Sequence, residues 1–143
     1  MYRKKAGELQ VLLVHPGGPF WKNKDLGAWS IPKGELAKDE EPLSAAIREF
    51  KEETGIDVDG KFLSLSPIRQ KSGKTVLAWA VEGNLDAAAI VSNTFSFEWP
   101  PKSGRWQEIP EVDKAGWFTL EEAAEKINVA QAALLVELGA KLQ

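Results

Sequence analysis

The chain has 143 residues, no cysteine and a single histidine, His15. Without cysteine it forms no disulfide and has no thiolate to offer as nucleophile or metal ligand. A Ser-His-Asp triad also has little support, because His15 ends the mostly apolar run Glu8–His15, where we expect a structural role. The lack of cysteine agrees with a reducing compartment, and a cytoplasmic protein is the expectation.

The sequence also lacks a long apolar run and an excess of basic residues. No segment approaches the roughly 20 apolar residues that span a bilayer, and Met1–Gln10 has no signal-peptide hydrophobic region. The net charge of −3 argues against a general nucleic-acid-binding surface. We therefore expect neither a membrane nor a nucleic acid as partner. A chain of this length is expected to form one domain, residues 1–143, and it carries no signal for an oligomeric state.

Acidic residues are present in excess in one short segment. Residues 35–53 hold seven acidic residues against three basic ones, so the remainder of the chain is close to neutral. The seven are Glu35, Asp39, Glu40, Glu41, Glu49, Glu52 and Glu53. Such a concentration of acid on an otherwise balanced protein suggests a cation site.

The apolar pattern and the turn residues predict a mixture of strands and helices. Strands are expected over Glu8–His15, Ala28–Ile31, Lys61–Ile68, Thr75–Val81 and Ala115–Phe118. Helices are expected over Pro42–Thr54, after the capping box Thr119–Glu122, and over Val129–Leu142, whereas Asn84–Trp106 is expected to be irregular. Strands with helices before and after them fit an α/β layered domain.

The helix expected over Pro42–Thr54 separates its acidic residues into two groups. At about 100° per residue, Glu49 and Glu53 lie one turn apart, beside a stripe expected to face the core. That stripe consists of Leu43, Ala46, Ile47, Phe50 and Thr54. Arg48 and Glu52 are neighbours on the outer side. Two adjacent carboxylates repel one another unless they are protonated or bridged by a cation, so Glu49 and Glu53 are the pair best placed to share a hard divalent ion. The alternative is a solvated acidic helix face balanced by Arg48 and Lys51.

The segment that contains this helix, Gly34–Ile56, is GELAKDEEPLSAAIREFKEETGI, with the spacing G-x5-E-x7-R-E-(apolar)-x-E-E-x-G-(apolar). A chain this long matches that pattern by chance with odds on the order of 10⁻⁷. The segment closely resembles the signature of the Nudix hydrolases. The resemblance implies an α/β/α sandwich with a central mixed sheet. Members of the family usually have a further strand before the one expected at Glu8, and because only Met1–Gly7 precedes it here, a sheet without the usual first strand is an open alternative.

The resemblance also implies roles for individual residues. Mg²⁺, with Mn²⁺ as an alternative, would be bound by the Gly34 carbonyl and by Glu49, Glu52 and Glu53, while Arg48 would orient a glutamate. Glu52 can reach either the ion or Arg48, and for Glu40 we favour a structural or outer role.

A further carboxylate is expected from a loop outside the signature, both to bind metal and to take a proton from the attacking water. The candidates are Glu111 and Glu108. We favour Glu111, because it lies six residues before Trp117, a spacing similar to that of the loop glutamate in the diadenosine tetraphosphate hydrolases of the family.

Nudix enzymes hydrolyse a nucleoside diphosphate linked to another group. The segments Trp29–Gly34 (WSIPKG) and Lys71–Ala80 (KSGKTVLAWA) resemble those of diadenosine tetraphosphate hydrolases that cleave asymmetrically. Lys33 and Lys74 are then candidate phosphate contacts, and the weaker candidates are Arg69, Lys71 and Arg105.

An aromatic group lies in the segment expected to be irregular, with Phe97 and Trp99 beside Phe95 and Trp106. It either stacks on a nucleobase, a role that we assign to Phe97 and Trp99, or forms a small satellite core. The leading hypothesis is a Mg²⁺-dependent pyrophosphohydrolase of a dinucleoside polyphosphate, such as diadenosine tetraphosphate, or of a nucleoside triphosphate. The alternatives are a hydrolase of another diphosphate, such as ADP-ribose or a diphosphoinositol, and a non-catalytic domain that senses a nucleotide.

Overall fold

The computed structural model describes residues 1–33 and 39–142. Strands and helices alternate along the chain in the order β1 (Tyr2–Lys5), β2 (Glu8–Pro16), α1 (Pro42–Thr54), β3 (Phe62–Arg69), β4 (Thr75–Val81), β5 (Thr94–Glu98), β6 (Trp106–Pro110), β7 (Val112–Thr119), α2 (Leu120–Lys126) and α3 (Ala132–Lys141). Short 3₁₀ turns cover Ala87–Ala89 and Val129–Gln131. Within the described residues, none of the helices combines the length and the hydrophobicity needed to cross a bilayer.

The strands form one sheet in the order β1-β2-β7 and two hairpins, β3–β4 and β5–β6, all with antiparallel ladders. Parallel pairing occurs at the isolated bridges Tyr2↔Glu82 and Trp29↔Ile127, and the first of these connects β1 with the end of β4. The alternative in which no strand precedes Glu8 is not observed, because Tyr2–Lys5 forms β1 and pairs with β2.

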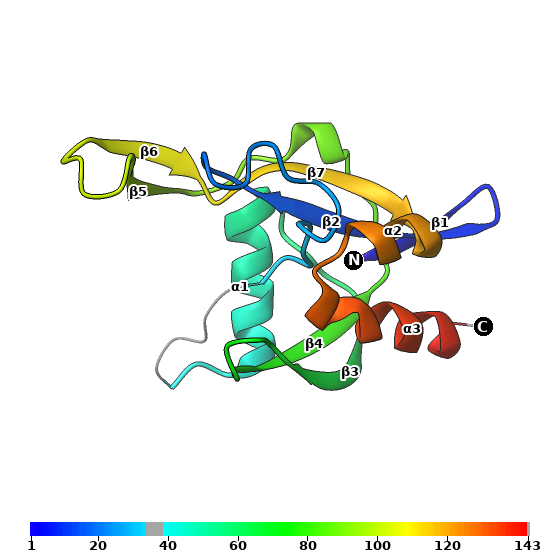
Figure 1. The fold of residues 1–143 in the computed structure, drawn as a ribbon. Coiled ribbons are helices and arrows are strands. Elements are labelled where there is room, and N and C mark those ends of the chain that lie inside the picture. Colours follow the sequence, from blue (N-terminus) through cyan, green and yellow to red (C-terminus); the bar gives the residue numbers. More distant parts are fainter. Residues whose placement is uncertain (34–38, 143) are drawn as a thin grey trace.

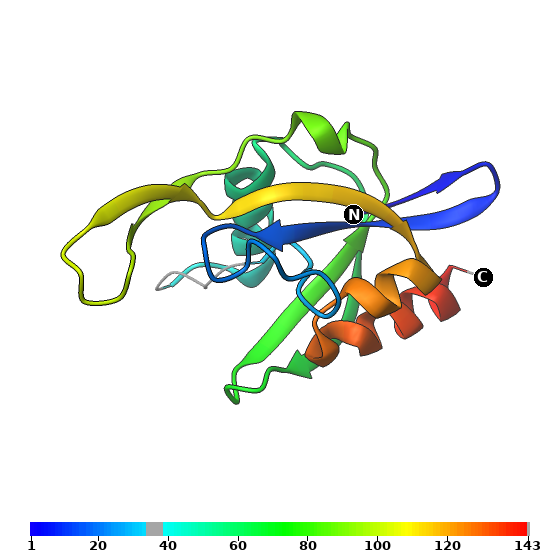
Figure 2. The same cartoon turned by 45° about the horizontal axis from the view of Figure 1, so that its top comes forward.

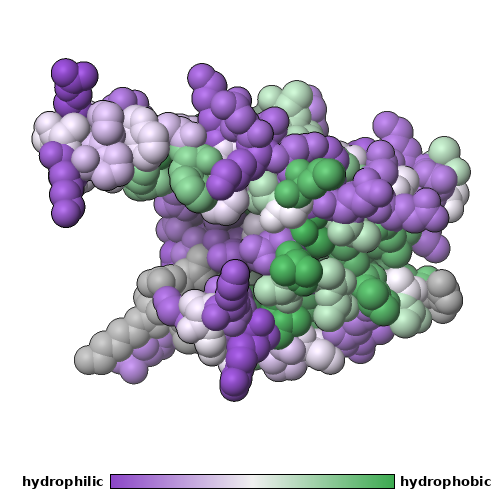
Figure 3. All heavy atoms as spheres, viewed as in Figure 1, coloured by the Kyte–Doolittle hydropathy of each residue, from purple (hydrophilic) through white to green (hydrophobic). Residues whose placement is uncertain are grey.

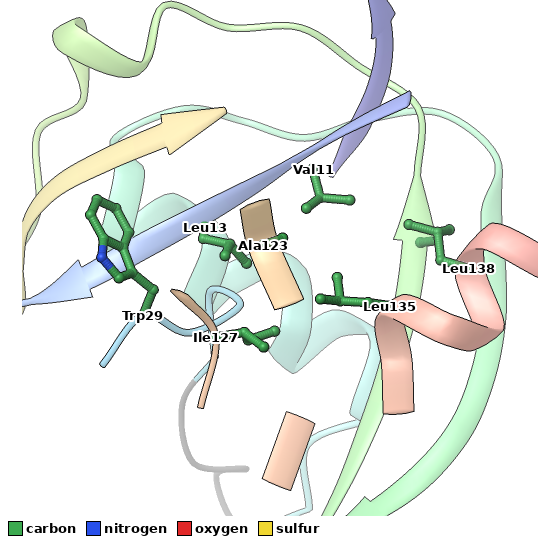
Figure 4. Close-up of a cluster of buried hydrophobic side chains, with 8 residues drawn as sticks. Val11, Leu13, Trp29, Ala123, Ile127, Leu135 and Leu138 are labelled. Carbon is green, nitrogen blue, oxygen red and sulfur yellow. The ribbon is translucent and has the colours of Figure 1, made fainter. Parts of the chain in front are cut away.

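The helices lie on opposite sides of the strands, as expected for an α/β/α arrangement. In Figures 1 and 2, α1 stands on one side and the α2–α3 pair on the other. The main core lies between β2 and the α2–α3 pair, as Figure 4 shows. Its buried members are Val11, Leu13, Trp29, Ala80, Ala123, Ile127, Leu135 and Leu138. The capping box of Thr119 and Glu122 is present and opens α2, whereas α3 begins at Ala132, later than expected.

The bounds of α1 agree with the prediction. Pro42 occupies its first turn, the Glu41 side chain accepts from the backbone N–H groups of Leu43 and Ser44, and Gly55 ends it in the left-handed region at φ 77°. The stripe expected to face the core does so only in the C-terminal half, where Phe50 and Thr54 are buried.

The N-terminal half of the stripe is different. Leu43, Ala46 and Ile47 are only half-buried and line a cavity of about 610 Å³. The opposite wall of this cavity is formed by β4, including Ala78 and Ala80. In this half the predicted stripe therefore faces a cavity that core residues also line, instead of packing closely against them.

The segment expected to be irregular contains a strand. Thr94–Glu98 pairs with β6, and the resulting hairpin, which we call the arm, projects from the body of the molecule in both ribbon views (Figures 1 and 2). Phe95 faces Ile109 and Phe97 faces Gln107 across the ladder, so these side chains share one face of the arm.

Candidate active site

Three carboxylates from two distant parts of the chain meet at one place. Glu49 and Glu53 lie one turn apart on α1 and are buried, with exposures of 9% and 7%. Glu111 lies between β6 and β7 and is half-buried. One carboxylate oxygen from each lies within 4.8 Å of the other two. The helical spacing predicted the first two as partners, and the structure brings Glu111, rather than Glu108, to them.

The environment of these carboxylates disfavours their charged form. Burial raises the pKa of Glu53 to about 8, with Glu111 and Glu49 adding to the effect, and the Lys33 backbone N–H that donates to Glu53 at 3.3 Å acts against it. Burial also raises the pKa of Glu49 and of Glu111, and the nearby Glu52 contributes in both cases. Together the three carboxylates carry more negative charge than their surroundings neutralise.

This donor set fits a hard divalent cation. Mg²⁺ prefers oxygen ligands, uses few protein carboxylates and completes its coordination with water and phosphate oxygens. A cation bound among Glu49, Glu53 and Glu111 would replace protonation as the way to relieve their repulsion. Of the predicted metal ligands among the described residues, Glu49, Glu53 and Glu111 lie together in this cluster.

Arg48 links the remaining acidic residues of the segment. Its Nε and Nη2 donate to the two Glu40 oxygens at 2.8 and 2.9 Å, and its Nη1 donates to Glu49 at 2.8 Å and to Glu52 at 3.1 Å. These bonds raise the pKa of Arg48 further, with Glu40 as the largest favourable contribution. The bidentate pair gives Glu40 the structural place that we favoured. Glu52, predicted as a metal ligand, binds Arg48 here and lies outside the three-carboxylate cluster.

The two lysines predicted to contact phosphate border one cavity. Lys33 and Lys74 both line the cavity of about 610 Å³, together with Glu49 and Gln70. Lys33 also lines a second cavity, of about 230 Å³, that contains Glu53 and Glu111. The weaker candidates Arg69 and Lys71 are exposed near the β3–β4 turn. Gly34, the predicted carbonyl ligand, lies outside the described residues.

The predicted aromatic contacts lie on the arm. Phe97 and Trp99 stack with ring centroids 6.0 Å apart, and Arg105 is exposed at the loop between the strands. Among the described lining residues, neither cavity includes Phe97, Trp99 or Arg105. Glu108 is also on the arm, where it accepts from the Ser96 hydroxyl. Figure 3 shows that the surface below the arm is hollowed and that its floor, over α1, is hydrophilic.

Sequence reasoning did not anticipate how Glu111 is held. Its carbonyl accepts from the Gly17 backbone N–H at 3.0 Å, and its own N–H donates to the Asn93 carbonyl at 2.8 Å. His15, expected to be structural, is fully buried and contacts Asp113 at 2.8 Å. No local pattern could have revealed a contact between residues 98 positions apart.

Comparison with known proteins identifies the family of the chain. The model of the NUDIX domain family matches residues 1–138. The mRNA-decapping enzyme subunit 2 of Saccharomyces cerevisiae is 31% identical over 100 residues, 66% of this chain and 8% of the yeast protein. The asymmetrical bis(5'-nucleosyl)-tetraphosphatase of Rattus norvegicus is 37% identical over 60 residues, 38% of this chain and 41% of the rat protein. The chain thus spans less than half the length of these two relatives.

Among solved structures, the binary complex of a C. elegans Ap4A hydrolase matches with a TM-score of 0.68 and 26% identity, covering 99% of this chain and 92% of that one. The fold therefore agrees with that of the C. elegans protein over almost the whole length of both. Because the family model also covers nearly the entire sequence, the chain belongs to the Nudix family.

Proposed function

We propose that the chain is a single-domain, cytoplasmic, Mg²⁺-dependent hydrolase that cleaves a phosphoanhydride bond in a nucleoside diphosphate linked to a second group. The observation that carries this proposal is the cluster of Glu49, Glu53 and Glu111, whose carboxylate oxygens lie within 4.8 Å of one another. Two of them are buried. Buried, clustered carboxylates are costly for stability alone, and they are typical of sites where a cation and an anionic substrate meet.

The residues around the cluster have distinct roles in this proposal. When bound, Mg²⁺ supplies neutralisation of phosphate charge and orientation of the attacking water, and Mn²⁺ would serve as a substitute. Glu49, Glu53 and Glu111 hold the ion, with Glu52 within reach beside Arg48. Glu111 also accepts the proton of the attacking water, because it is the carboxylate that reaches the cluster from outside α1. Arg48 keeps Glu49 and Glu52 oriented.

The cavity beside the cluster supports a substrate with a sizeable organic group. Its volume of about 610 Å³ falls within the usual range for small-molecule sites, roughly 300–1,000 Å³. Lys33 and Lys74 border it and would bind the phosphates next to Glu49. A dinucleoside polyphosphate such as diadenosine tetraphosphate, or a nucleoside triphosphate, fits this arrangement. The similarity to the rat tetraphosphatase and to the C. elegans Ap4A hydrolase favours the first.

The test is a panel of substrates in the presence of Mg²⁺, with products separated by chromatography. We expect diadenosine tetraphosphate to give ATP and AMP, and Glu53→Gln to reduce kcat by ~10²-fold or more. Glu121→Gln is the control, because Glu121 is an exposed acidic residue of α2, a different element from those that carry the three carboxylates. Activity retained in Glu53→Gln would contradict the metal assignment.

Metal binding can be measured apart from turnover. A ligand that binds only the folded state stabilises it by RT ln(1 + [L]/Kd), so Mg²⁺ is expected to raise the Tm of the wild type and not that of Glu53→Gln. Turnover of ADP-ribose or a diphosphoinositol that is faster than that of diadenosine tetraphosphate would instead identify a hydrolase of another diphosphate. Nucleotide binding without turnover of any substrate would instead identify a nucleotide-sensing domain.

A further inference from the structure

The pairing of β2 with β7 contains an irregularity next to Glu111. The register runs through Val14↔Ala115 and His15↔Lys114, and the next pair is Pro16↔Val112. Asp113 is therefore an extra residue in β7, which makes this point a β-bulge. Bulges redirect the side chains on either side of them, and this one lies two residues after Glu111.

The extra residue is held by its side chain. Asp113 Oδ1 lies 2.8 Å from His15 Nδ1. The second ring nitrogen, His15 Nε2, lies 2.7 Å from the carbonyl oxygen of Lys24. A carbonyl can only accept, so Nε2 carries a hydrogen and donates it. The imidazole is fully buried and is thus fixed at both ends, between the bulge and the loop that follows β2.

This contact bears on which way Glu111 points. A shift of one residue in the pairing of two strands moves every side chain to the opposite face. While Asp113 stays the unpaired residue, Pro16 faces Val112, and the Gly17 N–H meets the Glu111 carbonyl. If the bulge moved or disappeared, Glu111 would turn away from Glu49 and Glu53.

We propose that Asp113 and His15 are positioning residues that keep Glu111 in the three-carboxylate cluster. The inference rests on the proposed function, because it assigns them to the placement of its loop carboxylate. The Asp113 side chain is about one-third exposed, at 34%, so it fills no core volume, and its bond to His15 is the interaction that the fold gives it.

A double-mutant cycle separates positioning from general stability. We would measure Mn²⁺ affinity by electron paramagnetic resonance, and kcat and KM with diadenosine tetraphosphate, for Asp113→Ala, Glu111→Gln and the double variant. Asp113→Ala is expected to lower kcat by ~10–100-fold, since displacement of a catalytic group by about 1 Å has effects of this size. KM is expected to change less than kcat, and Mn²⁺ binding to weaken several-fold. In the Glu111→Gln background, Asp113→Ala is expected to cause no further loss in either measurement.

Two more variants sharpen the test. Asp113→Asn keeps a side-chain amide that can either accept from or donate to His15 Nδ1, and it is expected to restore most of the loss. His15→Gln should behave like Asp113→Ala if it folds. Asp25→Ala is the matched control, because the Asp25 side chain anchors the same loop through its bonds to Trp29 and Lys126 rather than through the bulge. It is expected to stay within about twofold of the wild type.

The proposal is overturned if Asp113→Ala matches the wild type, or if it causes the same loss with and without the Glu111 carboxylate. Failure of the wild type to cleave any substrate would overturn the proposed function instead. In that case the Mn²⁺ titrations in the two backgrounds would still decide the positioning role.

Discussion

Arg48 is the residue on which the acidic segment depends for charge balance. Its guanidinium binds Glu40 through two nitrogens and Glu49 and Glu52 through the third, at 2.8–3.2 Å. Its side chain is 36% exposed, so solvent weakens each ion pair. The bidentate geometry with Glu40, together with the bonds to Glu49 and Glu52, makes the group stronger than isolated surface pairs. Removal of this one cation leaves three carboxylates facing one another.

We therefore expect Arg48→Ala to lower the free energy of unfolding by about 1–2 kcal/mol in the absence of divalent cations. Arg48→Lys keeps the positive charge but not the planar guanidinium that binds Glu40 through two nitrogens, so its loss of stability should be smaller than that of Arg48→Ala. Denaturant titration measures both, and addition of Mg²⁺ should reduce the difference from the wild type. Equal stability of the wild type and Arg48→Ala at low salt would contradict this role for the network.

Glu53 makes the stability of the metal-free protein depend on pH. Its pKa is about 8 in the folded protein against a usual value of 4.5. Between these values the unfolded chain has lost the proton that the folded chain keeps, so the unfolded state binds fewer protons and stability falls as pH rises. Below the lower value both states are protonated, and this contribution is fully present.

In Glu53→Gln this dependence disappears. The variant is expected to be more stable than the wild type at pH 8 with a chelator present, by ~1–3 kcal/mol, and to differ much less at pH 4.5. The measurement is the free energy of unfolding from pH 4.5 to 8.5. If the two curves run parallel across that range, Glu53 keeps its ordinary ionisation in the folded protein.

At the scale of elements, the junction between β6 and β7 is held by a close backbone approach. A Cβ added at Gly17 would overlap the carbonyl oxygen of Pro110, immediately before Glu111. Gly17→Ala must therefore push the junction away from the end of β2. We expect a loss of about 1–3 kcal/mol in stability, and a fall in kcat greater than that loss alone explains.

Gly7→Ala is the control for this substitution. It adds the same methyl group in the β1–β2 turn, at φ 82° and with nothing within 4 Å. It should lower Tm through backbone strain and leave kcat unchanged. An equal reduction of kcat in both variants would remove the link between Gly17 and the carboxylate cluster.

The elements predicted most closely are those with strong local signals. Pro42 and Gly55 mark the ends of α1. The helical repeat of about 100° per residue predicts that Glu49 and Glu53 lie side by side, as they do. The arm was not predicted, although Phe95 and Phe97 alternate with polar residues in its first strand. Its second strand follows only after a seven-residue loop, Trp99–Arg105, and the partner of an isolated strand is set by tertiary structure.

At the scale of the whole molecule, the site depends on contacts that no segment contains. Glu111 lies beside Glu53 although 58 positions of sequence separate them. The family-like spacing between Glu111 and Trp117 favoured Glu111 over Glu108, but it did not indicate which contacts hold Glu111 in place. In the structure, backbone hydrogen bonds to Asn93 and Gly17 and the bulge at Asp113 hold Glu111 there. Residue identities thus predicted which carboxylates lie together, whereas the position of Glu111 follows from the arrangement of β2 and β7.

The cavity beneath α1 makes the two halves of that helix unequal in anchorage. The C-terminal half is tied to the segment that follows η1 (Ala87–Ala89), because Val91 and Asn93 donate backbone hydrogen bonds to Thr54 and Glu52. Leu43 and Ile47 of the N-terminal half line the cavity and are only half-buried, whereas Glu49 and Phe50, which line it from the C-terminal half, are buried. Amide hydrogens should therefore exchange with deuterium faster in the first two turns than in the last two. A ligand that fills the cavity would slow the faster half selectively, so that isotope uptake along a single helix would report occupancy of the site without any turnover.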